Sequence, residues 1–203
     1  MRLIFVLRLM AIVCLGVLGA PPAQAQWKDK ALPDSPFVLR GEFFRGATVF
    51  VRGLDPDHQS VRHWEAILDR PGEHMVVNFT ESLGNLIFDK DAPQPRLEKA
   101  GVNARNFPGL KWGEGGIITG GFGIWNYLHF TMQASRPLSC VGFATVVESV
   151  AAGDKRGLTG AYCREGTQRF EQEQIEAALK GIGIKGYYTP AEGPEPTPRR
   201  RGG

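Results

Sequence analysis

Motifs for metal binding and thiol redox chemistry are missing from this chain, because cysteine and histidine are scarce in it. The 203 residues include three cysteines and four histidines, and no Cys-x-x-Cys pair occurs. That absence argues against a zinc ribbon and against a thioredoxin-like site. Possible ligands do cluster in one stretch, at Asp55, Asp57, His58, His63 and Glu65. On a helix His58 and His63 would point about 140° apart, so we expect neither a metal site nor a cofactor.

Nucleophile and phosphate-binding motifs are also lacking. A serine hydrolase of the common kind needs a Gly-x-Ser-x-Gly motif around its nucleophile. That motif is absent around five serines of this chain: Ser60, Ser82, Ser135, Ser139 and Ser149. Six glycines lie between residues 113 and 123, but no Gly-Lys-Ser or Gly-Lys-Thr follows them. A P-loop is therefore excluded, and we interpret these glycines as hairpin or sheet-corner positions.

The chain has no strong basic excess and no second long apolar run. Its formal net charge is +3, and without Arg2 and Arg8 it would hold 22 basic against 21 acidic residues, a net charge of +1. Nucleic-acid-binding proteins usually present a clustered basic face, so we expect no nucleic-acid partner. The most apolar later segment, Gly115–Phe130, is rich in glycine. It predicts strands and turns, with no transmembrane segment after the N-terminal region.

The first 25 residues have the pattern of a secretory signal peptide. A basic start precedes an apolar run over residues 9–20, and small residues follow in Ala23-Gln24-Ala25. The pattern predicts cleavage between Ala25 and Gln26 and an exported protein, periplasmic or secreted. An uncleaved membrane anchor is the alternative, but Arg8 leaves the run shorter than the ~20 residues that a bilayer span needs.

Export would allow the two remaining cysteines, Cys140 and Cys163, to form a stable disulfide. Disulfides persist in the periplasm and outside the cell, and the predicted strands over residues 138–147 and 157–163 could bring the two sulfurs together. We therefore predict a Cys140–Cys163 disulfide, which the chain-entropy model values at about 3.4 kcal/mol. The alternative is a free catalytic cysteine with His129 as its base.

Periodicity predicts an α+β fold: a single domain with an antiparallel sheet of about six strands, two amphipathic helices and one disulfide. The helices are expected over Pro56–Asp69, where an Asp-Pro start precedes helically spaced apolar residues, and over Thr167–Lys180. Further strands are expected at residues 37–52, 74–80, 85–88 and 127–134. We expect residues 89–112 to form a long surface connection with a short helix at 96–100.

The predicted organisation along the chain has four parts. Residues 1–25 are the signal peptide, 26–36 a flexible lead-in, 37–190 the globular domain and 191–203 a disordered tail rich in proline, glycine and arginine. The three arginines 199–201 predict a solubilising end. Contact with anionic lipid or polysaccharide is the alternative, although three charges are few for that role.

Part of the chain resembles a known pattern. Cys140-Val141-Gly142-Phe143, then Gly160-Ala161-Tyr162-Cys163, then a helix ending in Leu179-Lys180-Gly181-Ile182-Gly183-Ile184 are similar to small uncharacterised exported bacterial proteins. The resemblance is confined to residues 140–184. It implies a disulfide beneath a terminal helix, and it implies no activity.

The function that these observations favour is a non-catalytic binding or accessory module of the bacterial cell envelope, with an envelope protein or surface polymer as its partner. Trp27 and Trp112, in loop-like contexts, are the candidate contacts, because tryptophan is enriched at binding hot spots. The competing hypothesis is an envelope hydrolase that uses His129 or His63 with a carboxylate such as Glu65 or Glu114. A purely structural secreted protein is the third, and the oligomeric state stays open.

Overall fold

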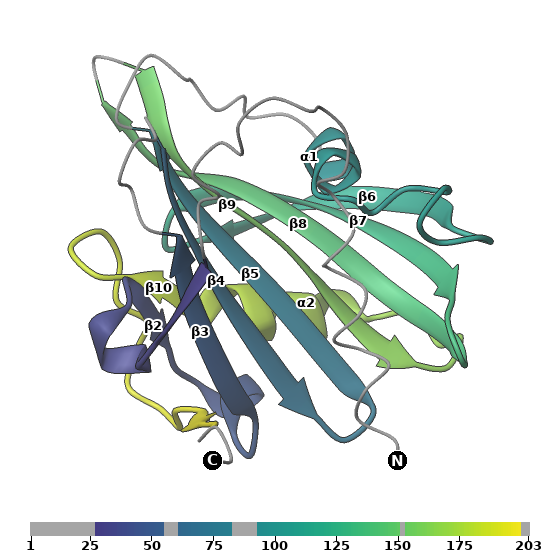
Figure 1. Ribbon diagram of the computed structural model, residues 1–203, viewed down its shortest axis with the longest axis horizontal. Coiled ribbons are helices and arrows are strands. Elements are labelled where there is room, and N and C mark those ends of the chain that lie inside the picture. Colours follow the sequence, from purple (N-terminus) through teal and green to yellow (C-terminus); the bar gives the residue numbers. More distant parts are fainter. Residues whose placement is uncertain (1–26, 55–60, 83–92, 151–152, 200–203) are drawn as a thin grey trace, which may run out of the picture.

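Nine strands join into one large sheet in the computed structural model, which describes residues 27–54, 61–82, 93–150 and 153–199 (Figure 1). From one edge to the other the sheet runs β1 (Trp27–Lys30), β3 (Thr48–Leu54), β4 (Val61–Arg70), β5 (Glu73–Ser82), β9 (Gly153–Glu165), β8 (Pro137–Val150), β7 (Gly123–Gln133) and β6 (Lys111–Gly120). These neighbours are antiparallel. The ninth strand, β11 (Thr197–Pro198), runs parallel to β3.

The remaining elements are few. β2 (Phe37–Leu39) and β10 (Ile182–Ile184) form a two-stranded sheet, and the helices are α1 (Pro93–Lys99), α2 (Gln172–Lys180) and the 3₁₀ turns η2 (Leu32–Asp34) and η3 (Glu42–Phe44). The described chain is therefore mostly β. The expected α+β fold with a six-strand sheet is wrong, because strands replace one expected helix and also occupy both ends of the domain.

The helix expected over Pro56–Asp69 is the main error. Residues 61–70 form β4, and residues 55–60 lie outside the described chain. The apolar residues of this segment fit a helical period, but Ala66 and Leu68 also alternate toward one face, where both are buried. β3 and β5 pair with β4 along its two sides. Backbone pairing on both sides and burial of alternate side chains together favour the strand over the helix.

Other local predictions are confirmed. Strands cover the stretches expected at 74–80, 127–134, 138–147 and 157–163, as β5, β7, β8 and β9. The last helix, α2, begins five residues later than expected, because Glu171 rather than Thr167 caps it. The Glu171 side chain accepts the N3 backbone N–H, and the Gln174 side chain accepts the Glu171 N–H at 3.0 Å, a reciprocal capping box. The strand expected at 85–88 lies outside the described residues.

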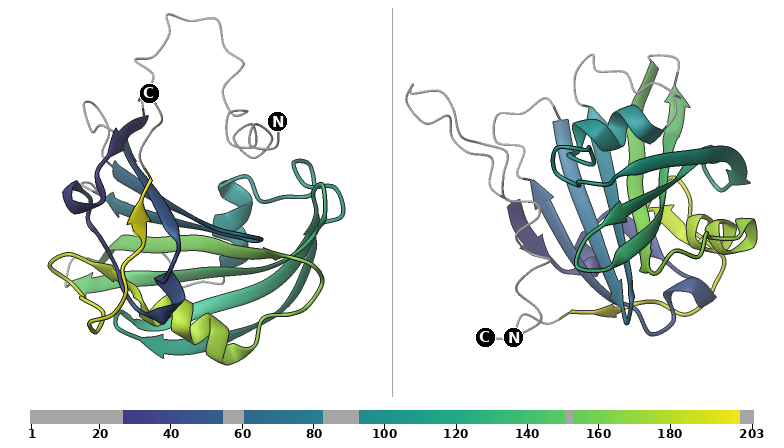
Figure 2. Two further views of the ribbon diagram at one scale, coloured as in Figure 1. Left: turned by 90° about the horizontal axis from the view of Figure 1, so that it is seen from below. Right: turned by 90° about the vertical axis from the view of Figure 1, so that its right-hand side faces the viewer.

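The large sheet buries both of its faces, to different extents. The α2 face carries the main core, which α2, the small sheet and Phe44 cover. The α1 face carries a smaller cluster of Leu97, Phe130, Cys140 and Cys163. Figure 2 shows α1 and α2 on opposite sides of the curved sheet. α1 approaches closely because its Leu97 lies over Gly142, where a Cβ would stand 2.2 Å from Leu97 Cδ1.

Both ends of the described chain lie along the outer edge of β3. β1 pairs with residues 51–54, and β11 pairs with Thr48 and Val49. Thr197 N–H donates to Ala47 O and Arg199 N–H to Val49 O, each at 2.8 Å. Residues 27–30 and 197–199, which lie within the expected flexible lead-in and disordered tail, thus have backbone partners along the β3 edge. The signal peptide, its cleavage site, Arg200 and Arg201 lie outside the described residues.

Candidate functional site

The two histidines of the hydrolase hypothesis do not share a site. His63 lies on β4 and faces the α1 side, whereas His129 lies on β7 and faces the α2 side. Three strands stand between β4 and β7, which at the usual strand spacing separates their backbones by roughly 19 Å. A single active site therefore cannot contain both residues.

Each histidine is also poorly equipped to work alone. His63 Nδ1 lies 3.1 Å from Thr80 Oγ1, and burial lowers the pKa of His63. His129 is 8% exposed, its Nδ1 has no hydrogen-bond partner among the described residues, and its pKa is lowered by burial and then by Arg169. Glu114 accepts from Arg169 at 2.9 Å. No described hydroxyl or thiol is hydrogen-bonded to His129 as a nucleophile would be.

Glu65 has a structural partner. It is 2% exposed, and it accepts from Arg52 Nε at 2.6 Å. The Arg52 guanidinium in turn lies 4.7 Å from the ring centroid of Trp27 on β1. A buried carboxylate needs such a partner, so this pair holds the N-terminal strand against the sheet. Glu65 and His63 share a face of β4, but no described hydrogen bond joins them.

The cysteine prediction is confirmed. Cys140 on β8 and Cys163 on β9 are directly opposed, with their Cα atoms 4.1 Å apart, and form a disulfide. Neither sulfur is a free nucleophile. Of the two candidate tryptophans, Trp112 packs at 5.1 Å against Phe130 in the α1-face cluster, and Trp27 is 37% exposed beside Arg52. Trp112 thus contributes to packing.

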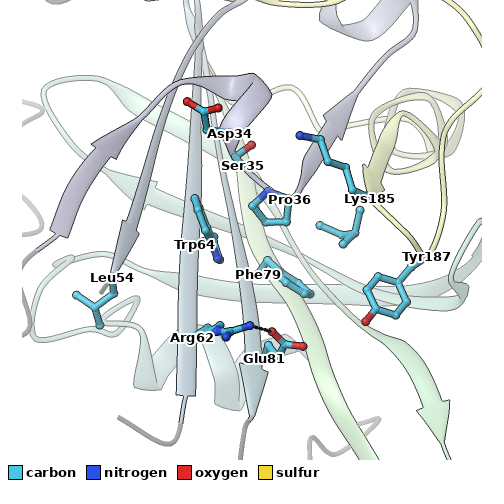
Figure 3. Close-up of a pocket in the computed structure, with 11 residues that line it drawn as sticks. Asp34, Ser35, Pro36, Leu54, Arg62, Trp64, Phe79, Glu81, Lys185 and Tyr187 are labelled. Atoms are coloured by element: carbon cyan, nitrogen blue, oxygen red, sulfur yellow. Dashed lines mark hydrogen bonds and ion pairs between the residues drawn. The ribbon is translucent and has the colours of Figure 1, made fainter. Parts of the chain in front are cut away.

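One concave feature of the described structure lies on the α2 face, at one end of β3, β4 and β5. We call it the end pocket (Figure 3). Its volume is about 540 Å³. Three separate segments line it: Asp34, Ser35 and Pro36; then Leu54, Arg62, Trp64, Phe79 and Glu81; and Ile184, Lys185 and Tyr187.

The floor of the end pocket is aromatic and held in place. Trp64 and Phe79 are directly opposed on β4 and β5. The Trp64 ring lies over Gly53 of β3, where a Cβ would come within 3.1 Å of it. Phe79 is 4% exposed. A glycine in the neighbouring strand therefore lets the indole lie flat on the sheet, and the indole forms part of the wall.

One end of the pocket carries an ordered charge network. Glu81 accepts from Arg156 Nε at 2.8 Å and from Arg62 Nη1 at 3.3 Å. Arg156 also lies 4.8 Å from the ring centroid of Tyr187, which is 40% exposed. Figure 3 shows the Arg62–Glu81 pair near Tyr187, and Asp34, Ser35 and Lys185 toward the opposite end. Polar groups thus flank an apolar floor.

The opposite end is anchored to the backbone. Ser35 Oγ donates to Leu32 O at 2.7 Å and accepts from Phe37 N–H at 3.2 Å. This hydroxyl therefore serves the turn and not a reaction. Lys185 Nζ donates to Pro33 O, and its backbone N–H donates to Pro36 O at 2.8 Å. The pocket thus combines an apolar aromatic floor with charged side chains at both ends, an arrangement suited to binding a ligand.

Sequence reasoning missed the end pocket. The expected helix over Pro56–Asp69 contains Trp64, and the expected flexible lead-in over residues 26–36 contains Asp34. The alternation of Arg62, Trp64 and Ala66 was the available signal, because on a strand it places a cation beside an aromatic ring on one face. In the described residues, no group of three His, Cys, Asp or Glu side chains is arranged to hold a metal, and no helix is long and apolar enough to cross a bilayer.

Comparisons with known proteins give limited similarity. No protein-family model matches the chain, and no curated protein matches it. Among solved structures, the apo immunity protein TplEi of the T6SS from Pseudomonas aeruginosa aligns at 14% identity with a TM-score of 0.37, over 66% of this chain and 50% of that one. TplEi in complex with "L" peptide aligns at 12% identity with a TM-score of 0.36, over 78% and 58%. The chain thus spans between 50% and 58% of the length of these proteins.

Proposed function

We propose that this protein is a non-catalytic binding module of the bacterial cell envelope and that the end pocket holds its ligand. The observation that carries the proposal is the preorganised lining. Gly53 seats Trp64, Arg156 fixes both Glu81 and Tyr187, and the turn at residues 33–36 fixes Lys185. Side chains that are already ordered lose little entropy on binding, which favours affinity.

The cellular location in this proposal rests on two further observations. The first 25 residues have a signal-peptide pattern, and the Cys140–Cys163 disulfide is the kind of bond that persists after export. A hydrolase that combines His129 with His63 is not proposed, because the sheet separates them. The purely structural protein remains as the outcome that the following experiment can return.

Site-specific photo-crosslinking in the envelope tests the proposal. With p-benzoylphenylalanine in place of Tyr187 at the pocket rim, we expect one discrete crosslinked species, identified by mass spectrometry. The matched control places the same group at Ile124, which is 60% exposed, lies on β7 and is not among the residues that line the pocket. Trp64→Ala should reduce the crosslink at position 187 at least about fivefold, and Trp27→Ala should leave it unchanged.

Three outcomes would count against the proposal. Equal crosslinking from positions 187 and 124 would show contact without a site. The absence of any crosslink at 187, in protein whose unfolding midpoint equals that of the unsubstituted chain, would favour the structural protein. Loss of the crosslink with Trp27→Ala rather than Trp64→Ala would move the ligand to the β1 edge.

A further inference from the structure

Arg62 has binding capacity that its own fold does not use. Its side chain is 50% exposed, and its described contact is one 3.3 Å hydrogen bond to Glu81. A guanidinium carries five N–H donors. The partner carboxylate is already bound more closely by Arg156, at 2.8 Å. Two guanidinium groups thus share the Glu81 carboxylate, and Arg62 is the more weakly held of the two, so most of its N–H donors are available to a ligand.

Arg62 lies beside the aromatic floor of the end pocket. Arg62 and Trp64 are two residues apart on β4 and therefore share a face of the strand. Their opposed residues on β5 are Glu81 and Phe79. Figure 3 shows the Arg62–Glu81 pair at the end of the floor that Trp64 and Phe79 form. An apolar group on this floor would place its neighbouring atoms next to the guanidinium.

A half-exposed guanidinium with unused donors is complementary to a carboxylate, and from its place beside the apolar floor we infer that the end pocket takes a protein segment in which an aromatic or aliphatic side chain stands next to a carboxylate. The inference rests on the proposed function and names its ligand class. The apolar side chain covers Trp64 and Phe79, and the carboxylate accepts from Arg62. Hydrogen bonds between charged partners are stronger than neutral ones, whereas a neutral ligand covering Arg62 would remove water without replacing those bonds.

Four small compounds test this inference on the mature, oxidised protein. Indole-3-propionate carries the ring and the carboxylate, tryptamine carries the ring and a cation, 3-methylindole carries the ring alone, and glucuronate carries a carboxylate on a sugar. Binding is followed by NMR at the assigned indole N–H of Trp64. We expect indole-3-propionate to bind about tenfold more tightly than 3-methylindole, as a hydrogen bond to a charged group allows, and tryptamine to bind most weakly of the three indoles.

Variants separate the charge from the ring. Arg62→Gln should remove the preference for indole-3-propionate without abolishing indole binding. The control is Arg136→Gln, because Arg136 is 68% exposed and pairs with Glu165 away from the pocket. A display selection of random heptapeptides should enrich an acidic residue next to an aromatic one on the unsubstituted protein and lose that enrichment on Arg62→Gln.

The outcomes distinguish the inference from the proposed function. Equal binding of all three indoles, unchanged by Arg62→Gln, would overturn the ligand class and leave the pocket as a binding site. Tighter binding of tryptamine would reverse the sign of the charge, and tighter binding of glucuronate would point to an acidic polysaccharide; either result overturns the inference. Failure of every compound and peptide to bind would overturn the proposed function as well.

Discussion

The two faces of the large sheet are stabilised in different ways. The α2 face packs 24 buried residues into one cluster, whereas the cluster on the α1 face has four, two of which are the disulfide cysteines. Hydrophobic burial scales with area, so the α2 face supplies most of it. The α1 face combines a seven-residue helix with a covalent bond between β8 and β9. Where apolar burial is small, a disulfide is a common substitute in exported domains.

The position of the end pocket fits this contrast. It lies at the margin of the α2 face, where Phe79 and Ile184 belong both to the core and to the lining. A pocket whose floor is continuous with a large core can hold its aromatic side chains rigidly. The α1 face provides less support of this kind, and its tryptophan, Trp112, is used for packing.

The largest effect is expected from a truncation on the α2 face. Phe143 is 1% exposed, and its ring lies 5.8 Å from that of Trp125. Phe143→Ala should lower the free energy of unfolding by about 3–5 kcal/mol, because it removes buried area and leaves a cavity. Urea unfolding followed by fluorescence measures this loss. A change below about 1 kcal/mol would show that this face can repack, contrary to the contrast drawn above.

Removal of the disulfide should have the next largest effect. Replacement of Cys140 and Cys163 by alanine together should cost about 3.4 kcal/mol, because the unfolded chain regains the freedom of the closed loop. Urea unfolding of the variant is compared with that of the unsubstituted protein with and without reductant. If the double variant is as stable as the oxidised protein, the α1 face does not depend on its covalent bond.

A double-mutant cycle on the α1 face sharpens the comparison further. Leu97→Ala should cost about 2 kcal/mol, at the low end for a buried leucine, because α1 is short and can shift. Gly142→Ala should also destabilise the protein, since its Cβ would meet Leu97 Cδ1. In the Leu97→Ala background Gly142→Ala should cost less than it does alone. Strict additivity of the two losses would mean that α1 does not rest on Gly142.

The smallest effect is expected from pH, and it involves one histidine on each face. The folded-state pKa values of His63 and His129 lie below the ordinary value of 6.5, chiefly because of burial. Their contribution to stability is therefore complete above about pH 6.5 and is lost as the pH falls below it through the folded-state pKa values. His63→Gln and His129→Gln should each flatten the stability profile between neutral and mildly acidic pH. Stability that rises on acidification through this range would contradict the assigned direction.

Local patterns in the chain accounted for much of the β8–β9 region and α2. Period-two alternation located β5, β7, β8 and β9, the cysteine count with the expected signal peptide paired Cys140 with Cys163, and helically spaced apolar residues located α2. These features depend on residues near one another in sequence, or on the two cysteines that remain when residues 1–25 are set aside. The candidate contact Trp27 stays a prediction, because its exposed ring is compatible with binding and with the Arg52 contact.

The sequence alone thus determined those elements whose short-range periodicity or cysteine pairing allows a single interpretation. The tertiary structure decided the rest. Val61–Arg70 has an apolar pattern that fits both a helix and a strand, and only the presence of β3 and β5 on its two sides selects the strand. The lead-in and the tail have too few apolar residues to fold by themselves, yet the β3 edge pairs with residues 27–30 of the first and 197–198 of the second. The end pocket brings together residues 34–36, 54–81 and 184–187. Contacts between such distant segments depend on sheet order, for which no local pattern codes.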